Sequence, residues 1–331
     1  MRATQLHRAS GIVLLRTISM SMIVLCHLCT FWKAPSLFSQ LFTVGVHIFV
    51  IISGWLYIDR DIDTLSYRWL FDRWRKLCIP LILWVVIIDL ISSLFGEGIS
   101  AKDLLLLLFN LQGLTWVLPF SPALSNNGVV AGLGHLWFVT IIFLCYILIR
   151  IRIIKEHPFA FTIFLLFLSI CLAPFGIRLS FFISFFVGCL LKRIVSYRPV
   201  VYIISIVVIL FSILLRLIGR HYYDGTYLYN ILIGGFAQTL LAAGIFVLIK
   251  GLVEHYLVLQ RISNSWSVRQ CDALSYYIYI THYIFLCEQL KLSILIPAIV
   301  PQTVAFLALS IISALGLRWV TDQTNSLINR I

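Results

Sequence analysis

Long apolar runs dominate the pattern of hydrophobic and polar positions along this chain. Segments such as 44–58, 77–95 and 200–218 contain at most one formally charged side chain each. Their lengths approach the roughly 20 residues with which a helix spans the hydrocarbon core of a bilayer. A transmembrane β-barrel would need strands of about 10 residues with alternating hydrophobicity, and these runs do not alternate. Because backbone polar groups in lipid must be paired, the pattern predicts an all-α bundle of membrane-spanning helices.

We expect about ten transmembrane helices in a single domain that covers residues 1–331. The apolar run 103–109 is too short to cross, so it is predicted to form a short re-entrant or interfacial helix within an extracytoplasmic connection at 97–134. The other loops are too short for a second domain. The predicted spans, to within a few residues, are 12–32, 41–58, 78–96, 135–150, 159–175, 178–192, 199–219, 230–250, 273–290 and 297–319.

The distribution of positive charge predicts the orientation. Nineteen of the 25 Lys and Arg residues fall in segments on the N-terminal side of the membrane, and the other six fall opposite. Since cytoplasmic loops are enriched in Lys and Arg, we expect both termini inside, N-in and C-in. The composition agrees, with 61% hydrophobic and only 11% charged residues. The net charge of +12 fits basic loops that face an anionic inner leaflet, so nucleic acid is not an expected partner.

Ionisable side chains inside the predicted spans are candidate functional groups, because a membrane interior makes them costly. Arg16 and His27 are eleven positions apart on one predicted helix. Eleven residues make about three turns, which places both side chains on one face, about 16 Å apart along the axis. Such a face suits a site that binds an anionic donor from the cytoplasm and performs proton or acyl chemistry near mid-membrane. A snorkelling arginine and a hydrogen-bonded core histidine are the alternative.

Five short motifs follow one another along the chain: Arg16-x10-His27, GVHIFVIISGWL at 45–56, RWRKLCIP at 73–80, HLWF at 135–138 and SYYIYITH at 275–282. In this order, they resemble the motifs of the type 3 acyltransferases, integral membrane proteins that O-acylate bacterial surface polysaccharides. The resemblance covers nearly the whole chain. It departs from the family pattern at Val13 and His47, where acidic residues are frequent, and at Lys76, which replaces the second arginine of an Arg-x-x-Arg motif and loses its bidentate fork.

The resemblance implies transfer of an acyl group, commonly acetyl from acetyl-CoA, to a hydroxyl of a cell-surface glycan or its lipid-linked precursor. It places the protein in the bacterial inner membrane, with His27 as general base or transient acyl acceptor and Arg16 as its catalytic partner. Cations suit the phosphates of CoA, so donor binding is expected at Arg16, Arg73, Arg75 and Lys76. Residues expected to bind the acceptor or support the site, each with a purely structural role as the alternative, are His47, Ser53, His135, Trp137, Tyr279 and His282.

Other functional classes are less well supported. A transporter or flippase for a lipid-linked saccharide or small solute would also place charges in a helical bundle, but the second half of the chain does not repeat the motifs of the first half. A polyprenyl-phosphate-dependent glycosyltransferase would more often use an outward-facing carboxylate, and the predicted outer loops contain few acids. The sequence has no P-loop, paired Cys/His cluster or nucleophile elbow, so neither a metal nor a permanently bound cofactor is expected.

Overall fold

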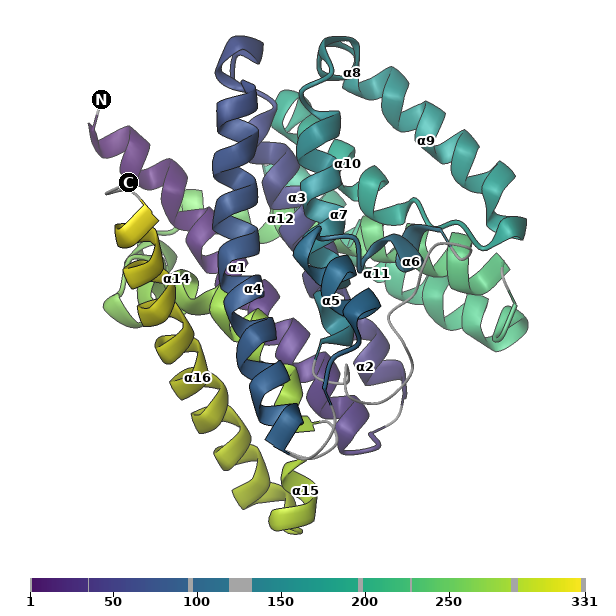
Figure 1. Cartoon of the computed structure of the whole chain (residues 1–331). Coiled ribbons are helices and arrows are strands. Elements are labelled where there is room, and N and C mark those ends of the chain that lie inside the picture. The colour runs from purple at the N-terminus through teal and green to yellow at the C-terminus, as the bar shows by residue number, and fades with distance from the viewer. Residues whose placement is uncertain are drawn as a thin grey trace.

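Helices form all the regular secondary structure in the described part of the chain (Figure 1). The structure is a computed structural model that describes residues 2–34, 36–94, 98–118, 133–195, 199–226, 228–286 and 291–328. The predicted all-α class is confirmed.

Every predicted span contains at least one helix. The main helices are α1 (Arg2–Phe31), α2 (Ser36–Phe42), α3 (Val44–Tyr57), α4 (Tyr67–Leu94), α7 (Trp137–Leu148), α9 (Pro158–Leu172), α10 (Ser180–Ile194), α11 (Pro199–Tyr223), α12 (Gly234–His255), α14 (Trp266–Thr281) and α16 (Ile299–Ile328). Shorter helices are η1 (Ile62–Thr64), α5 (Ala101–Leu108), α6 (Leu114–Val117), η3 (Gly134–Leu136), α8 (Arg152–Glu156), η4 (Ala173–Phe175), η5 (Leu228–Ile233), α13 (Leu257–Ser263), η6 (His282–Leu286) and α15 (Leu292–Leu295).

Seven helical stretches of the described chain are long and apolar enough to cross a membrane. In the other three predicted spans, helices α7, α10 and α14 have 12, 15 and 16 residues. Two of these three continue directly from or into a 3-10 segment, because η3 precedes α7 and η6 follows α14. The protein is therefore a multi-pass helical membrane protein, and the count of ten remains a prediction.

Both termini lie at the same end of the bundle (Figure 1). Basic residues from several predicted cytoplasmic segments interact with neighbouring loops and helix ends. Lys192 lies 3.5 Å from a carboxylate oxygen of Asp59, and Arg150 donates to the carbonyl oxygen of Leu65 at 2.6 Å. The shared end agrees with an even number of crossings, whereas the N-in, C-in orientation remains a prediction.

The connection predicted at 97–134 includes the short helix α5. Its first turn is capped by Ser100, whose side-chain oxygen accepts a hydrogen bond from the backbone N–H of Asp103 at 3.1 Å. Residues 119–132 of this connection lie outside the described residues.

Two reciprocal glycines bring α3 and α10 into backbone contact. A Cβ atom added to Gly54 would lie 1.9 Å from the carbonyl oxygen of Phe185, and one added to Gly188 would lie 2.2 Å from that of Ile51. Small residues allow such close helix packing in membranes. Gly54, in the Ser-Gly-aromatic end of the second sequence motif, thus lets α3 pack directly against α10. The same two helices contribute His47 and Phe181 to the pocket described below.

Candidate active site

Three imidazoles from distant parts of the sequence meet inside the bundle. His27 lies on α1, His135 on η3 and His282 at the start of η6. The ring centroids of His27 and His282 are 5.2 Å apart, those of His135 and His282 5.1 Å, and those of His27 and His135 6.4 Å. The structure therefore brings together three of the histidines that the sequence nominated.

Backbone carbonyls orient two of these rings. His135 Nε2 lies 2.7 Å from the carbonyl oxygen of Tyr279, while the Tyr279 hydroxyl donates to the carbonyl oxygen of His135. His282 Nδ1 lies 2.9 Å from the carbonyl oxygen of Ile278. A carbonyl accepts only from an N–H, so the proton of neutral His135 is on Nε2 and that of neutral His282 is on Nδ1. Their other nitrogens, His135 Nδ1 and His282 Nε2, are buried without a hydrogen-bond partner among the described residues, and each presents a lone pair.

His27 and His135 border a pocket of about 600 Å³, whereas His282 lies behind them and is not among its lining residues. This volume lies within the range of about 300–1,000 Å³ that is typical of small-molecule sites. Its lining includes His27, His47, His135, Trp137 and Tyr279 from the sequence prediction.

His47 is anchored on one wall of the pocket by a chain of hydroxyl groups. Its Nδ1 lies 2.8 Å from Ser184 Oγ, which in turn lies 2.9 Å from Thr239 Oγ1. The ring stacks on Phe181, with 4.5 Å between centroids. Ser53 is placed differently: its hydroxyl donates to the carbonyl oxygen of Phe49 within α3 at 3.1 Å, and it does not line this pocket.

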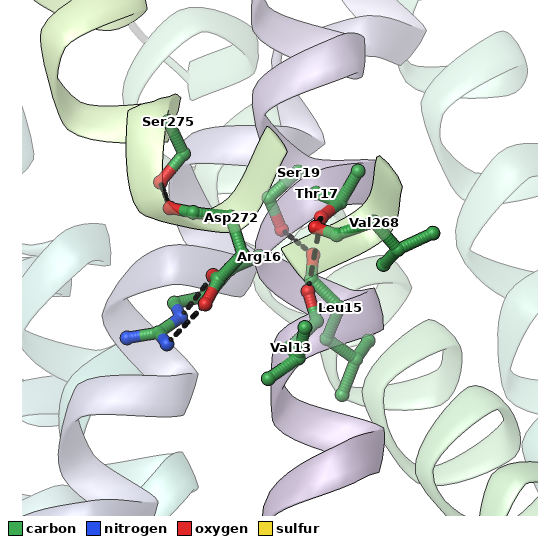
Figure 2. A network of polar contacts seen from close by, with 8 residues as sticks. All are labelled: Val13, Leu15, Arg16, Thr17, Ser19, Val268, Asp272 and Ser275. Carbon is green, nitrogen blue, oxygen red and sulfur yellow. Dashed lines mark hydrogen bonds and ion pairs between the residues drawn. The ribbon is translucent and has the colours of Figure 1, made fainter. Parts of the chain in front are cut away.

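Arg16 forms an ion pair with Asp272 of α14 (Figure 2). Arg16 Nη2 donates to Asp272 Oδ2 at 2.7 Å, and Arg16 Nε lies 2.7 Å from Asp272 Oδ1. The remaining terminal nitrogen of Arg16 points away from the carboxylate (Figure 2). The Arg16 side chain is 38% exposed and does not line the pocket of His27.

Helices α1 and α14 run side by side in the same direction, with contacts at two levels. At the first level, Arg16 pairs with Asp272. At the second, His27, eleven residues further along α1, lies beside His282, which follows Asp272 by ten residues at the start of η6. Arg16 and His27 therefore share a face, as their spacing predicts, and that face is covered by α14 and η6. Sequence reasoning missed Asp272 because the predicted span began at 273; an acid ten positions before His282 was the available signal.

The basic run of α4 adjoins the level of the ion pair. The hydroxyl of Tyr276, one turn after Asp272, donates to the carbonyl oxygen of Leu77 at 2.6 Å, directly after this run. The guanidinium of Arg73 lies 5.6 Å from the ring centroid of Tyr57, and Lys76 is exposed. Arg75 is half-buried. The end of the basic run therefore contacts α14 one turn after Asp272, the ion-pair partner of Arg16.

Two further arginines, Arg178 and Arg216, line the pocket itself. Arg216 is only 7% exposed. Both belong to the six positive charges assigned above to the side opposite the N-terminus, although Arg216 falls inside the predicted span 199–219. An arginine within an apolar run was the signal that identifies it.

A multi-pass helical bundle with clustered imidazoles beside a pocket that contains several polar side chains has the features of a membrane enzyme that works on a bound small molecule. Comparison with known families gives the particular class: residues 10–320 of the 331 match the family described as an acyltransferase domain, and the chain belongs to this family. The resemblance seen in the sequence motifs is thereby confirmed, and the protein is an acyltransferase. Neither the curated proteins nor the solved structures gave a significant match.

Proposed function

We propose that this protein is an O-acyltransferase of the bacterial inner membrane. It transfers an acyl group, acetyl in the simplest case, from cytoplasmic acyl-CoA to a hydroxyl of a cell-surface glycan or its lipid-linked precursor. The observation that carries this proposal is the position of His27 in a pocket of substrate size, beside two imidazoles that each present a lone pair.

The separation between Arg16 and His27 along α1 suits the length of a CoA thioester. CoA carries its phosphates at one end and its thioester at the other, joined by a long pantetheine arm. Arg16, Arg73, Arg75 and Lys76 offer positive charge for the phosphates. His27 lies about 16 Å further along α1, where the thioester would react. The pairing with Asp272 leaves one terminal nitrogen of Arg16 directed away from the carboxylate (Figure 2).

His27 has two possible roles in the transfer. As a general base, it takes the proton of the acceptor hydroxyl while the hydroxyl oxygen attacks the thioester carbonyl carbon; the C–S bond breaks and the thiolate takes that proton back from the imidazolium. As a nucleophile, it forms an acyl-imidazole with loss of CoA thiol, and the acceptor hydroxyl then attacks this intermediate. In both routes, the ring N–H of His27 that does not take part in the reaction donates to the lone pair of His135 or His282, which orients the reacting nitrogen toward the pocket.

Purified protein in lipid nanodiscs, given radiolabelled acetyl-CoA and a saccharide acceptor, tests the proposal. We expect labelled ester on the saccharide with wild-type protein and with His255→Ala, a control at an exposed histidine outside the pocket. His27→Ala should abolish transfer while the yield of folded protein stays unchanged. Normal transfer by this variant would exclude His27 as the reacting group. Acid quenching without acceptor distinguishes the two routes, because only the nucleophilic route leaves label on the protein.

A further inference from the structure

Arg216 is a buried cation with unused hydrogen-bonding capacity. Its side chain projects from α11 into the wall of the pocket that holds His27. Nη2 reaches Gln40 Oε1 at 3.5 Å, a long hydrogen bond, while Nε and Nη1 are buried without a hydrogen-bond partner in the described ranges. With only 7% of the residue exposed, water cannot compensate these donors freely.

The surroundings of Arg216 are held by side chains from three other elements. Gln40 Oε1 also accepts a hydrogen bond from the Tyr229 hydroxyl at 3.1 Å. Gln238 Nε2 donates to the carbonyl oxygen of Gln40 and to Thr43 Oγ1, both at 2.6 Å. These contacts fix Gln40, the residue to which Arg216 donates its long hydrogen bond, before any ligand binds, which lowers the entropic cost of binding.

The pocket has positive charge and no matching carboxylate. Arg178 and Arg216 are among its lining residues, which include no Asp or Glu where the structure describes them. Asp224, the acid nearest to Arg216 in sequence, lies 3.7 Å from Arg220 instead. The undescribed segment 119–132 contains no acidic residue, whereas the undescribed segments 95–97 and 287–290 contain Glu97 and Glu288. A buried charge in a membrane bundle needs a counter-ion. Since no carboxylate of the described residues pairs with Arg216, an anion from outside the chain is the partner that its position in the pocket wall favours.

We propose that the acceptor of this enzyme carries an oxyanion, a carboxylate or a phosphate, which Arg216 binds while the hydroxyl to be acylated reaches His27. This inference rests on the proposed acyl transfer and adds the chemical class of its acceptor. None of the cations assigned to the donor lines the pocket, and Arg16 lies about 16 Å along α1 from His27, so Arg216 serves a second anion beside the reacting groups. Hydrogen bonds from a guanidinium to an oxyanion are charge-assisted and strong.

Anion binding can be tested without any transfer. The midpoint of thermal unfolding of the full-length, detergent-purified protein is measured in sodium phosphate, sodium glucuronate and sodium chloride at equal ionic strength. We expect phosphate or glucuronate to raise the midpoint of the wild type and of Arg220→Gln, a control one turn further along α11. The increase should vanish in Arg216→Gln. It should be smaller than in the wild type in Arg216→Lys, which keeps the charge but not the guanidinium; this variant provides the test if Arg216→Gln does not fold. The anion with the larger effect identifies the group. No increase in the wild type, or an equal increase in the Arg216 variants, would overturn the proposal.

The transfer assay then places the anion on the acceptor. With acetyl-CoA as donor, methyl glucuronide, glucose 6-phosphate and neutral methyl glucoside are compared as acceptors. Arg216→Gln should raise the KM of the preferred acidic acceptor by about tenfold or more, a change that corresponds to about 1.4 kcal/mol of binding energy. The KM of acetyl-CoA and that of the neutral sugar should not change. An unchanged acidic-acceptor KM, or an equal rise for acetyl-CoA, refutes the assignment. Absence of any transfer by the wild type would instead count against the proposed function, while the unfolding measurement would still decide whether Arg216 binds an anion.

Discussion

The Arg16–Asp272 ion pair gives a quantitative test of how α1 and α14 are joined. Removing one partner of a buried pair costs about 3–5 kcal/mol of unfolding free energy, whereas an exposed pair contributes about 0–1 kcal/mol. Asp272 is largely buried, with 12% of its side chain exposed, but Arg16 is 38% exposed, so solvent screens part of the attraction. We therefore expect Asp272→Asn to lower the free energy of unfolding by about 1–2 kcal/mol.

The measurement is a double-mutant cycle with Arg16→Gln, Asp272→Asn and the double variant. Unfolding is followed by titrating the protein in mixed micelles with a denaturing detergent. A coupling energy of about 1–2 kcal/mol is expected, because each single change leaves the other charge unpaired. A coupling below about 0.3 kcal/mol, within the usual error of additivity, would refute the claim that this pair joins the helices.

The same variants separate a structural arginine from one that binds the donor. If Arg16 contacts a CoA phosphate, Arg16→Gln weakens the affinity for acetyl-CoA, whereas Asp272→Asn retains the cation and removes a competing carboxylate, so affinity is kept or increased. Equal losses in both variants would show that Arg16 acts only through packing. Equilibrium binding of labelled acetyl-CoA to protein in nanodiscs makes this comparison without depending on turnover.

Three further variants test the scaffold around the pocket. Gly54→Val should prevent accumulation of folded protein, because its Cβ would lie 1.9 Å from a backbone oxygen. Gly316→Ala should be tolerated, because no neighbouring atom lies within 4 Å of its Cβ, and size-exclusion profiles compare the two variants. Tyr279→Phe removes the hydroxyl that holds the His135 carbonyl and should cost about 1 kcal/mol of stability and lower transfer; wild-type kinetics would contradict this role. His47→Phe keeps a ring against Phe181 but loses the bond to Ser184, so the acceptor KM should rise at constant acetyl-CoA KM.

Sequence periodicity predicted local relations well and long-range relations poorly. The shared face of Arg16 and His27 followed from helical geometry alone, because both side chains belong to one helix. The meeting of His27 with His135 and His282 depends on how three separate segments pack, and only the resemblance to a family suggested that they act together. Asp272 and Arg216 were missed because each lies near the end of a predicted span. The span that begins at 273 left Asp272 outside, and Arg216 was counted as a charge of the loop after its helix.

The two missed residues distinguish Arg16, which lies outside the pocket, from Arg216, which lines it. Arg16 has an internal counter-ion, Asp272, and its ion pair is part of the fold before any ligand is present. Arg216 has one long hydrogen bond, to the neutral side chain of Gln40, and two nitrogens without a partner among the described residues, so a ligand is needed to complete its interactions. A charge neutralised within the fold contributes to stability, while a desolvated charge left unpaired contributes to specificity, since it favours only ligands that bring the opposite charge. On this argument, replacing Arg216 should alter which acceptors are used more than it alters stability, and replacing Asp272 should do the reverse.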